Sequence, residues 1–522
     1  MPPDALAASN PNQLATTDPE VIGETGIELS GAMPDNWSDL WTKPADGPSS
    51  LDWQRLEKLS RALALSTPHV NRVSDFSTLV GSEDLRHAPV HRWFAYKEGF
   101  SPALLDKAIN SLGLPAGLKV CDSFGGVATT ALAGLAHPSV SEVRSVEYSP
   151  FARFVGQTKL RWPTLNADRL TSLLKPALEF DESRPVEVPE LAAFSNKEIF
   201  SRERVKQLLR AREHLKQLPG ALEAERDFLL LGLAAVIEDL SGAMKDGRAL
   251  RIKRGRTRRL SSLSSTPPLV PASGKVKRAL AAQWSAMIGD LRSLEPTGKA
   301  AEGTVAHHLP GDARDLASIS LHDGSQAFPD GWADFSLFSP PYLNCIDYTE
   351  IYKLELWLMG FVSDQQVFRK TRLGTLRSHP SIRFPERTYF DGVEADVVDL
   401  VEGAADWIRS NGSRPEVGPI VKQYFEDMLQ VWREQFRVLA PGASAVCVIA
   451  NSTFSRREQV GDGTRREHWR LPLLTDVIVA ELAKIAGFST VKIWEARGLR
   501  PRNVQQGRAR EALVVVSKAA DG

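Results

Sequence analysis

The chain is poor in cysteine and has no long apolar run. Its three cysteines, Cys121, Cys345 and Cys447, lie far apart and form no Cys-x-x-Cys pair. This spacing disfavours a zinc site and a disulfide framework, and it fits a reducing compartment. The longest apolar run, Phe228 to Ile237, is too short to span a bilayer. Because the N-terminus also lacks the basic-then-apolar pattern of a signal peptide, we expect a cytoplasmic protein without a membrane partner.

Net charge is absent as well, since 64 basic side chains balance 64 acidic ones. A balanced charge argues against a purely electrostatic nucleic-acid binder, although it leaves room for a local basic groove. Hydrophobic residues make up 42% of the 522 residues and charged residues 25%. This composition is typical of a globular protein, and the length predicts two or three structural units.

Strand and helix patterns alternate in two parts of the chain, separated by a mostly helical stretch. Apolar strands are predicted at Leu118 to Cys121, Val143 to Val146, Phe335 to Phe338 and Ser444 to Ser452. Such alternation predicts a parallel sheet covered by helices on both faces. The predicted units are a flexible leader (1–45), a first α/β part (46–160), a helical insertion (161–300) and a second α/β part (301–522).

The first strand of this pattern runs into a glycine-containing loop, "DSFGGVATT", that begins at Asp122 and leads into a helix near Thr129. Strand, glycine turn and helix start is how α/β sheets bind nucleotide-like ligands, because glycine lets the backbone approach the ligand. Glu147 ends the next strand and is placed to accept hydrogen bonds from ribose hydroxyls. Alone, this loop fits an ordinary Rossmann-like turn equally well.

A second loop, Ser339-Pro340-Pro341-Tyr342, ends another predicted strand. Its two prolines have no N–H to give, so the local backbone offers hydrogen-bond acceptors. The Ser339 oxygen and the Pro340 carbonyl would face a group with two N–H donors, and Tyr342 adds a flat stacking surface. This arrangement suits a planar base with an exocyclic amino group, either single-stranded or flipped from its duplex. On its own, Pro-Pro-Tyr is more often just a rigid turn.

Together the two loops resemble the S-adenosylmethionine-dependent amino-methyltransferases that act on DNA bases. "VCDSFGGVATTALAG" is similar to the family's cofactor loop, Asp-x-Phe-x-Gly-x-Gly, and "FSPPY" to its catalytic loop. "YKEGFSPALL", Tyr96 to Leu105, resembles the helix that covers the methionine end of the cofactor. "PGDARDL", Pro310 to Leu316, resembles the acidic segment near the cofactor's adenine. The resemblance covers roughly residues 90–160 and 305–518 and implies a Rossmann-like methyltransferase sheet, mostly parallel with an antiparallel last strand.

The resemblance also implies the cofactor, S-adenosyl-L-methionine, and the residues that use it. The implied cofactor-binding residues are Tyr96, Phe100, Ser101, Asp122, Phe124, Gly125, Gly126, Thr129, Glu147 and Asp312. The implied catalytic residues are Ser339, Pro340, Pro341 and Tyr342, which would orient the amino nitrogen for direct attack on the sulfonium methyl group. No metal is needed, and we interpret Cys345 as structural and His307-His308 as solvated loop residues. The pattern's last glycine is Ala128, whose Cβ could crowd the methionine end, and Ser123 replaces a common proline.

Two basic segments are candidates for contacts with the phosphate backbone. Lys245 to Arg259 holds eight basic residues and one acidic residue, and arginines on a loop suit phosphate contacts. We predict nucleic-acid binding for Arg251, Lys253, Arg254, Arg256, Arg258 and Arg259, with a solvated loop as the alternative. The same two readings apply to Lys370 to Arg387. After the catalytic loop, Asp347 and Tyr348 either line the base pocket or cap the next helix, whereas Lys353 and Glu355 are expected to face that helix.

The function that follows is a site-specific DNA methyltransferase, with the helical insertion as candidate target-recognition domain. Serine at the first position of the catalytic loop favours N4-cytosine over N6-adenine as the target. The expected partners are double-stranded DNA with a flipped base and a restriction or phage-defence protein, in the nucleoid of a prokaryote. Two alternatives stay open: an RNA methyltransferase acting on guanine N2 or a similar amine, and a non-catalytic DNA-binding protein that keeps the fold.

Overall fold

The architecture is that of the computed structural model of the chain. The structure describes residues 40–43, 50–190, 196, 198–245, 250–253, 267–294, 303–344, 346–459, 465–499 and 509–520. The predicted leader therefore lies outside the described residues except for 40–43. These four residues are packed rather than loose, because Leu40 and Trp41 are buried and Thr42 pairs with Arg470.

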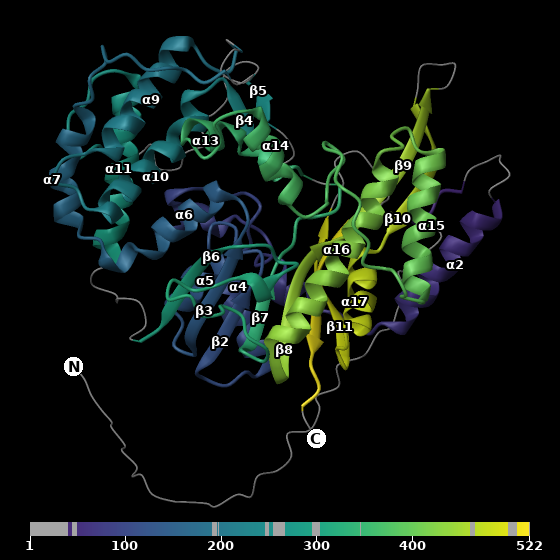
Figure 1. Cartoon of the computed structure of the whole chain (residues 1–522). Coiled ribbons are helices and arrows are strands. Elements are labelled where there is room, and N and C mark those ends of the chain that lie inside the picture. The colour runs from purple at the N-terminus through teal and green to yellow at the C-terminus, as the bar shows by residue number, and fades with distance from the viewer. Residues whose placement is uncertain are drawn as a thin grey trace, which may run out of the picture.

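An eight-stranded sheet forms the centre of the described chain (Figure 1). Every neighbouring pair is parallel except the two pairs made by β12. The predicted Rossmann-like sheet with an antiparallel last strand is thus confirmed. In spatial order the strands are β1 (His69–Asn71), β11 (Thr490–Leu499), β12 (Ala509–Ser517), β8 (Leu439–Ala450), β7 (Ala333–Phe338), β2 (Leu118–Asp122), β3 (Val140–Glu147) and β6 (Val305–Pro310).

Helices cover both faces of this sheet. Alternate residues of a strand point to opposite faces, so Val446 and Val448 of β8 join one core and Cys447 the other. The first face packs on α3 (Val73–Phe76), α4 (Ala103–Leu112) and α5 (Thr129–Leu135). The second packs on α16 (Val417–Val438) and α17 (Thr475–Ile485). The second half of β8 and the middle of β12 are apolar runs because both faces of the sheet are buried there.

The predicted insertion forms a helical block with its own core, at the upper left of Figure 1. Its elements are α7 (Ala167–Leu178), α9 (Arg202–Lys216), α10 (Glu223–Leu240), α11 (Lys275–Leu294) and the hairpin β4 (Ala243–Lys245)–β5 (Leu250–Ile252), with α6 (Pro150–Leu160) beside it. Chain from beyond the predicted boundary at residue 300 also enters this core. It comes from α12 (Tyr348–Ile351), α13 (Lys353–Leu358) and α14 (Gln365–Gly374).

A third group of elements packs beside the sheet, at the right of Figure 1. It consists of α2 (Ser50–Ser66), α15 (Asp396–Asn411) and the hairpin β9 (Ser452–Gln459)–β10 (Arg465–Leu473). The Trp53 ring contacts those of Trp41, Trp407 and Trp469, and Trp407 also contacts Trp469, so these rings tie the group together. Among the described residues, none of the helices combines the length and apolarity that crossing a bilayer requires.

Candidate functional site

A cavity of about 550 Å³ opens where β2, β3 and β7 end. Parallel strands have their carboxyl ends at one edge of the sheet. Ligands of α/β sheets bind at this edge, in the crevice between two adjacent strands whose following connections cross to opposite faces of the sheet. Here β2 lies between β3 and β7, so the loops after all three strands meet. The loop from Asp122 to Val127, the stretch from Glu147 to Ser149, and Ser339, Pro341 and Tyr342 all line this cavity.

The glycines of the loop after β2 are required by its geometry. Gly126 has φ of +52° and donates its N–H to Glu147 Oε2 at 2.9 Å. A Cβ on Gly125 would lie 2.8 Å from His308 and 2.9 Å from Ser145, so the loop can sit close to the sheet only without a side chain. The Phe124 N–H is held by Asp122 Oδ1 at 3.0 Å. The loop is therefore pre-formed, with its backbone exposed to a ligand.

Ala128 does not crowd the cavity, although a Cβ at this position of the loop could have done so. Its backbone adopts the left-handed conformation, with φ of +68°, that the missing glycine would adopt. The side chain is fully buried in the core below α5, facing Gly156 of α6, and lies outside the cavity lining. The neighbouring Ser123 does line the cavity, and its buried hydroxyl has no partner in the structure. A polar ligand would satisfy that hydroxyl.

Burial raises the pKa of two carboxyl groups at this end of the cavity. The pKa of Asp122 rises to about 6 because burial disfavours its charged form. Burial raises the pKa of Glu147 to about 7, and the nearby Asp122 adds to the shift. The two oxygens of Glu147 accept N–H bonds from Gly126 and Ser149, yet each retains a further lone pair. Ligand hydroxyls or a positive charge would stabilise the ionised forms.

The catalytic loop predicted from the sequence is held by bonds to the neighbouring strands. The Ser339 hydroxyl donates to the Val448 carbonyl at 3.2 Å, which leaves its lone pairs available as acceptors. The Tyr342 hydroxyl donates to Glu511 Oε1 at 3.3 Å, and Arg497 Nε donates to Glu511 Oε2 at 2.8 Å. Pro340 is buried behind the residues that line the cavity.

Nearly all the predicted cofactor-binding residues meet in this cavity. Its lining includes Tyr96, Phe100, Asp122, Phe124, Gly125, Gly126, Thr129, Glu147 and Asp312. Ser101 does not line it, because its hydroxyl donates to Asp84 at 2.7 Å and accepts from the Ala103 N–H. Ser101 therefore orders the start of α4 and is not placed to contact a ligand. The carboxylate of Asp312 is engaged by the Arg314 guanidinium, whose Nη2 lies 2.7 Å away.

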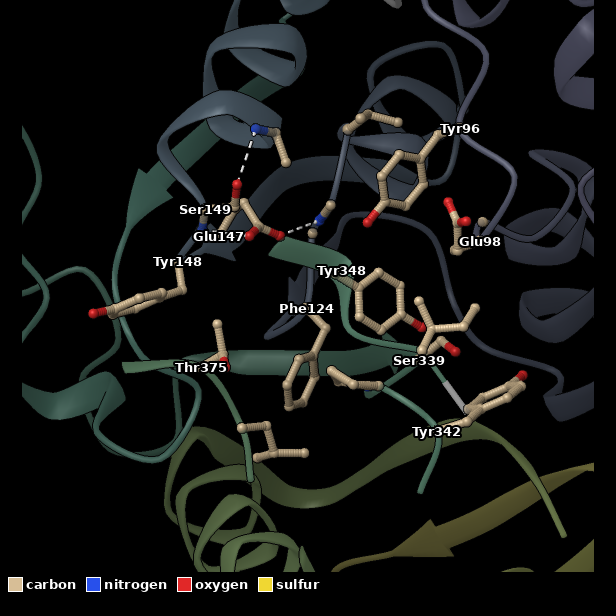
Figure 2. Close-up of a pocket in the computed structure, with 18 of the residues that line it drawn as sticks. Tyr96, Glu98, Phe124, Glu147, Tyr148, Ser149, Ser339, Tyr342, Tyr348 and Thr375 are labelled. Atoms are coloured by element: carbon tan, nitrogen blue, oxygen red, sulfur yellow. Dashed lines mark hydrogen bonds between the residues drawn. The ribbon is translucent and has the colours of Figure 1, made fainter. Parts of the chain in front are cut away.

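Aromatic residues face the cavity, including Tyr148 and Tyr352, which sequence reasoning missed. Five of the seven tyrosines line it: Tyr96, Tyr148, Tyr342, Tyr348 and Tyr352. Tyr96 stacks on Tyr352 with ring centroids 5.2 Å apart. Figure 2 shows Glu147 and Tyr148 at the left, Ser339 and Tyr342 at the lower right, and Glu98 beside Tyr96 at the upper right. A signal in the sequence was present for Tyr352, which follows the catalytic loop closely, and for Glu98, which is two residues from Tyr96.

The residues after the catalytic loop divide as follows. Asp347 caps α12 through the Thr349 and Glu350 N–H groups and also lines the cavity, so both readings hold for it. Tyr348 lines the cavity. Lys353 pairs with Glu350 at 2.8 Å, on its own helical stretch as expected. Glu355 instead is buried and pairs with Lys245 of the helical block.

The first basic segment is only partly described. Lys245, its first residue, is buried. Arg251 is exposed on β5. Lys253 donates to the Glu238 and Ser241 carbonyls at 2.9 and 3.1 Å. Its ammonium group therefore caps the end of α10 and is not placed to bind a phosphate. The other predicted contacts, Arg254, Arg256, Arg258 and Arg259, lie outside the described residues.

The second basic segment combines buried and exposed cations. Arg377 is 1% exposed and bonds Asp427 at 2.7 Å. Arg372 pairs with Asp347 at 2.7 Å and lines the cavity. Lys370, Arg383 and Arg387 are exposed. Neither predicted role, phosphate contact or solvated loop, fits the whole segment. One part of it lines the cavity, and another part forms a positively charged surface.

The histidines and cysteines considered in the sequence are part of the sheet and its buried core where the structure describes them. The prediction of a solvated loop at His307-His308 is wrong, because both residues belong to β6 and His308 is 4% exposed. Burial lowers the pKa of His308 to about 3, so it is neutral beneath the glycine loop after β2. Cys121 and Cys447 are buried free thiols, and Cys345 lies outside the described residues. The described residues include no cluster of three His, Cys, Asp or Glu side chains able to hold a metal ion.

Comparison with known proteins gives relatives over most of the chain. M.BsoBI, a type II methyltransferase of Geobacillus stearothermophilus, is 23% identical over 468 residues, which span 82% of this chain and 84% of that protein. M.AvaI, a type II methyltransferase of a Nostoc species, is 23% identical over 508 residues, or 90% of this chain and 93% of that protein. No protein-family model matches. The relatives confirm the predicted resemblance to methyltransferases of the DNA-modifying type.

Solved structures are only distantly similar. An rRNA methyltransferase of Streptomyces viridochromogenes is 11% identical, with a TM-score of 0.26 over 84% of this chain and 92% of that one. A DNA modification methylase of Thermus thermophilus is 16% identical, with a TM-score of 0.17 over 40% of this chain and 52% of that one. At these scores the overlap says nothing about the substrate.

Proposed function

We propose that this relative of the type II methyltransferases moves a methyl group from S-adenosylmethionine to the exocyclic amino group of a DNA base, with cytosine N4 favoured over adenine N6. One observation supports this most strongly. A glycine loop suited to a nucleoside and a Ser-Pro-Pro-Tyr loop suited to an amino group line the same cavity. Neither loop is specific alone, but a transfer reaction needs both ligands side by side.

The donor groups of the cavity fit S-adenosylmethionine. Glu147 offers acceptors for ribose hydroxyls, and Gly125 and Gly126 allow close approach of the ligand. The buried Ser123 hydroxyl and one Glu98 oxygen lack partners within the protein. Aromatic faces beside carboxylates suit a ligand that carries positive charge. Asp312, held by Arg314, lies at the end of the cavity formed after β6.

S-adenosylmethionine, when bound, supplies an electrophilic methyl group on a sulfonium centre. The protein's own residues orient the nitrogen that receives it. Because the Ser339 hydroxyl donates to Val448, its lone pairs are free to accept an N–H of the base. The resemblance implies that the Pro340 carbonyl takes the second N–H, although Pro340 does not line the cavity in this structure. Together these two bonds would localise the nitrogen lone pair for in-line attack. Tyr342, fixed by Glu511, would stack on the base.

The choice of cytosine is supported by Ser339, since the resemblance associates serine at this position with N4-cytosine. Duplex DNA would reach the cavity with the target base flipped. The exposed Arg251, Arg383 and Arg387 are candidates for phosphate contacts. The type II relatives support a restriction enzyme as functional partner, and a DNA substrate would bring the protein to the nucleoid.

A methyl-transfer assay tests the proposal. Labelled S-adenosylmethionine is offered with duplex DNA, single-stranded DNA or total RNA, and the modified nucleosides are identified by mass. We expect N4-methylcytosine in DNA with the wild type, and none with Ser339→Ala or Tyr342→Ala. N6-methyladenine would change the base but keep the function. Label confined to RNA would move the protein to the RNA class, and no transfer without cofactor binding would leave a non-catalytic DNA-binding protein.

A further inference from the structure

Glu98 places a carboxylate in the cavity that the protein itself only half satisfies. It lies on the loop before α4, next to Tyr96, and Figure 2 shows its carboxyl group beside the Tyr96 ring. Oε2 accepts a hydrogen bond from the Tyr352 hydroxyl at 2.5 Å. Oε1 is buried without a hydrogen-bond partner. A buried oxygen of this kind costs free energy unless a ligand satisfies it.

The other buried or half-buried carboxylates of the cavity are already matched. Glu147 holds two N–H groups, Glu511 holds Tyr342 and Arg497, and the remaining pairs are Asp122 with Phe124 N–H, Asp312 with Arg314, and Asp347 with Arg372. Among these lining residues, Glu98 is the carboxylate with a buried, unpartnered oxygen. This unpartnered oxygen can accept a hydrogen bond from a donor group on the ligand.

The position of Glu98 within the cavity indicates which part of a ligand it meets. Glu147 marks the ribose end, and Ser339 marks the place where the methyl group must be delivered. The amino-acid arm attached to the same sulfur must then extend away from both the ribose and the target base. Glu98, on the wall opposite Glu147 in Figure 2, closes that remaining direction. The stacked rings of Tyr96 and Tyr352 beside it suit a cation.

We propose that Glu98 binds the α-ammonium group of the methionine arm of S-adenosylmethionine, and so makes that arm a requirement for tight binding. This inference rests on the cofactor of the proposed function. An ammonium group supplies the N–H donor that Oε1 lacks and the positive charge that a buried carboxylate needs. Glu98 then discriminates the complete cofactor from nucleosides that share its adenosine end.

The charged groups around Glu98 leave room for this role. Tyr352 donates to it, and Lys245 and Lys97 approach it only at longer range, lowering its pKa against the larger raising effect of burial. Lys245 is taken by Glu355, and Lys97 donates to the Lys245 carbonyl. Burial holds the pKa of Glu98 above its usual value. The ammonium contact should therefore weaken as pH falls, because protonation removes the carboxylate charge.

Calorimetry with two probes tests the inference without catalysis. S-adenosylhomocysteine carries the amino-acid arm, whereas 5′-methylthioadenosine lacks it and keeps the adenosine. In Glu98→Gln we expect affinity for S-adenosylhomocysteine to fall roughly 10- to 100-fold, the usual size of a hydrogen bond to a charged group. Affinity for 5′-methylthioadenosine should stay within about twofold, since the adenosine end is untouched. In the wild type, the ratio of the affinity for S-adenosylhomocysteine to that for 5′-methylthioadenosine should decrease as the pH is lowered. In Glu98→Gln this ratio should not change with pH.

Glu426→Gln is the matched control, because Glu426 is a buried glutamate with an unpartnered Oε1 outside the cavity. It should leave both affinities unchanged. Equal loss of both probes in Glu98→Gln would overturn the inference and make Glu98 a structural residue. Unchanged binding of both with a raised KM for DNA would overturn it in favour of a base contact. Failure of the wild type to bind either probe would instead refute the proposed cofactor.

Discussion

The hydroxyl of Tyr342 is tied to the last two strands of the sheet. It donates to Glu511 of β12, and Arg497 of β11 holds the same carboxylate. Glu511 is thus a positioning residue that fixes the plane of a ring expected to stack on the base. We predict that Glu511→Gln and Tyr342→Phe each lower kcat about 3- to 10-fold, the net size of one typical hydrogen bond, without changing KM for the cofactor.

The double variant separates positioning from general damage. If Glu511 acts through the Tyr342 hydroxyl, kcat of the double variant should equal that of the single variant with the lower kcat. Tyr389→Phe, outside the cavity lining, should leave kcat unchanged. Steady-state kinetics on duplex DNA gives both numbers. Additive losses in the double variant would mean that Glu511 does not act through Tyr342.

Glu147 gives a pH dependence whose sign can be worked out. Its pKa rises from 4.5 in the unfolded chain to about 7 in the folded one. Between these values the folded protein binds more protons, so the free energy of unfolding falls as pH rises from about 4.5 to about 7. In Glu147→Gln this decline should be shallower, by up to about 1 kcal/mol per pH unit. Urea unfolding of the ligand-free protein at several pH values measures it, and parallel curves would contradict the prediction.

Single residues also show where sequence reasoning stops. Asp122, Gly126, Glu147 and Ser339 could be placed because each follows a recognisable strand, and strand ends meet at one edge. Glu98 could not, since what distinguishes it is the absence of a partner for one oxygen. The Tyr342–Glu511 bond spans 169 positions, and no local pattern announces it. Ser101 was misplaced because a serine before a helix looks the same whether its hydroxyl faces Asp84 or a ligand.

The packing of α6 against β6 supports the glycine loop after β2 from below. Gly156 of α6 leaves space for the buried His308, and a Cβ there would lie 2.6 Å from the imidazole. We predict that Gly156→Ala lowers the free energy of unfolding by about 1–3 kcal/mol through this clash. Gly289→Ala in α11 has no atom within 4 Å and should instead stabilise by about 1 kcal/mol through helix propensity.

Urea unfolding of the two alanine variants compares the same chemical change in two helices. In a His308→Ala background the obstacle is gone, so Gly156→Ala should cost much less there. A stabilising Gly156→Ala would show that α6 can move away from β6. The glycine loop after β2 would then not depend on a rigid contact beneath it.

Elements with a strong apolar period were predictable, and those defined by distant partners were not. The central strands β2, β3 and β7 lie where their apolar runs predicted them. β8 begins at Leu439 rather than Ser444, because a register shift opposite Ala333 and Phe335 accommodates Pro441-Gly442 within the strand. The hairpin β9–β10 was missed, since much of it is polar and its buried Trp469 packs on helices from elsewhere in the chain.

The helical block and the sheet are joined through buried charges. Asp290 of α11 binds Arg92 and the Trp93 indole just ahead of the cavity wall that carries Tyr96 and Glu98. Lys245 of β4 pairs with Glu355 after the catalytic loop. Removing one partner of such a pair leaves an uncompensated buried charge. The insertion therefore supports segments that line the cavity, although none of its described residues lines the cavity itself.

Charge over the surface of the molecule leads to a final prediction about DNA. The net charge is zero, so attraction to phosphate must come from local cations. Arg383 and Arg387 are exposed on the segment that also supplies Ile382 and Phe384 to the cavity wall. A duplex presenting a base to the cavity would bring its backbone to this segment. If each arginine neutralises one phosphate, the double change to glutamine should reduce the slope of log K against log salt by about 2.

Fluorescence anisotropy with a labelled duplex measures that slope in the wild type and in the Arg383→Gln/Arg387→Gln variant. The loss of affinity should be uniform across sequences, because phosphate contacts position a protein without reading bases. Arg414→Gln, an exposed arginine already paired with Glu416, is the control and should not change the slope. An unchanged slope in the double variant would place the DNA elsewhere, with Arg251 of the helical block as the next residue to replace.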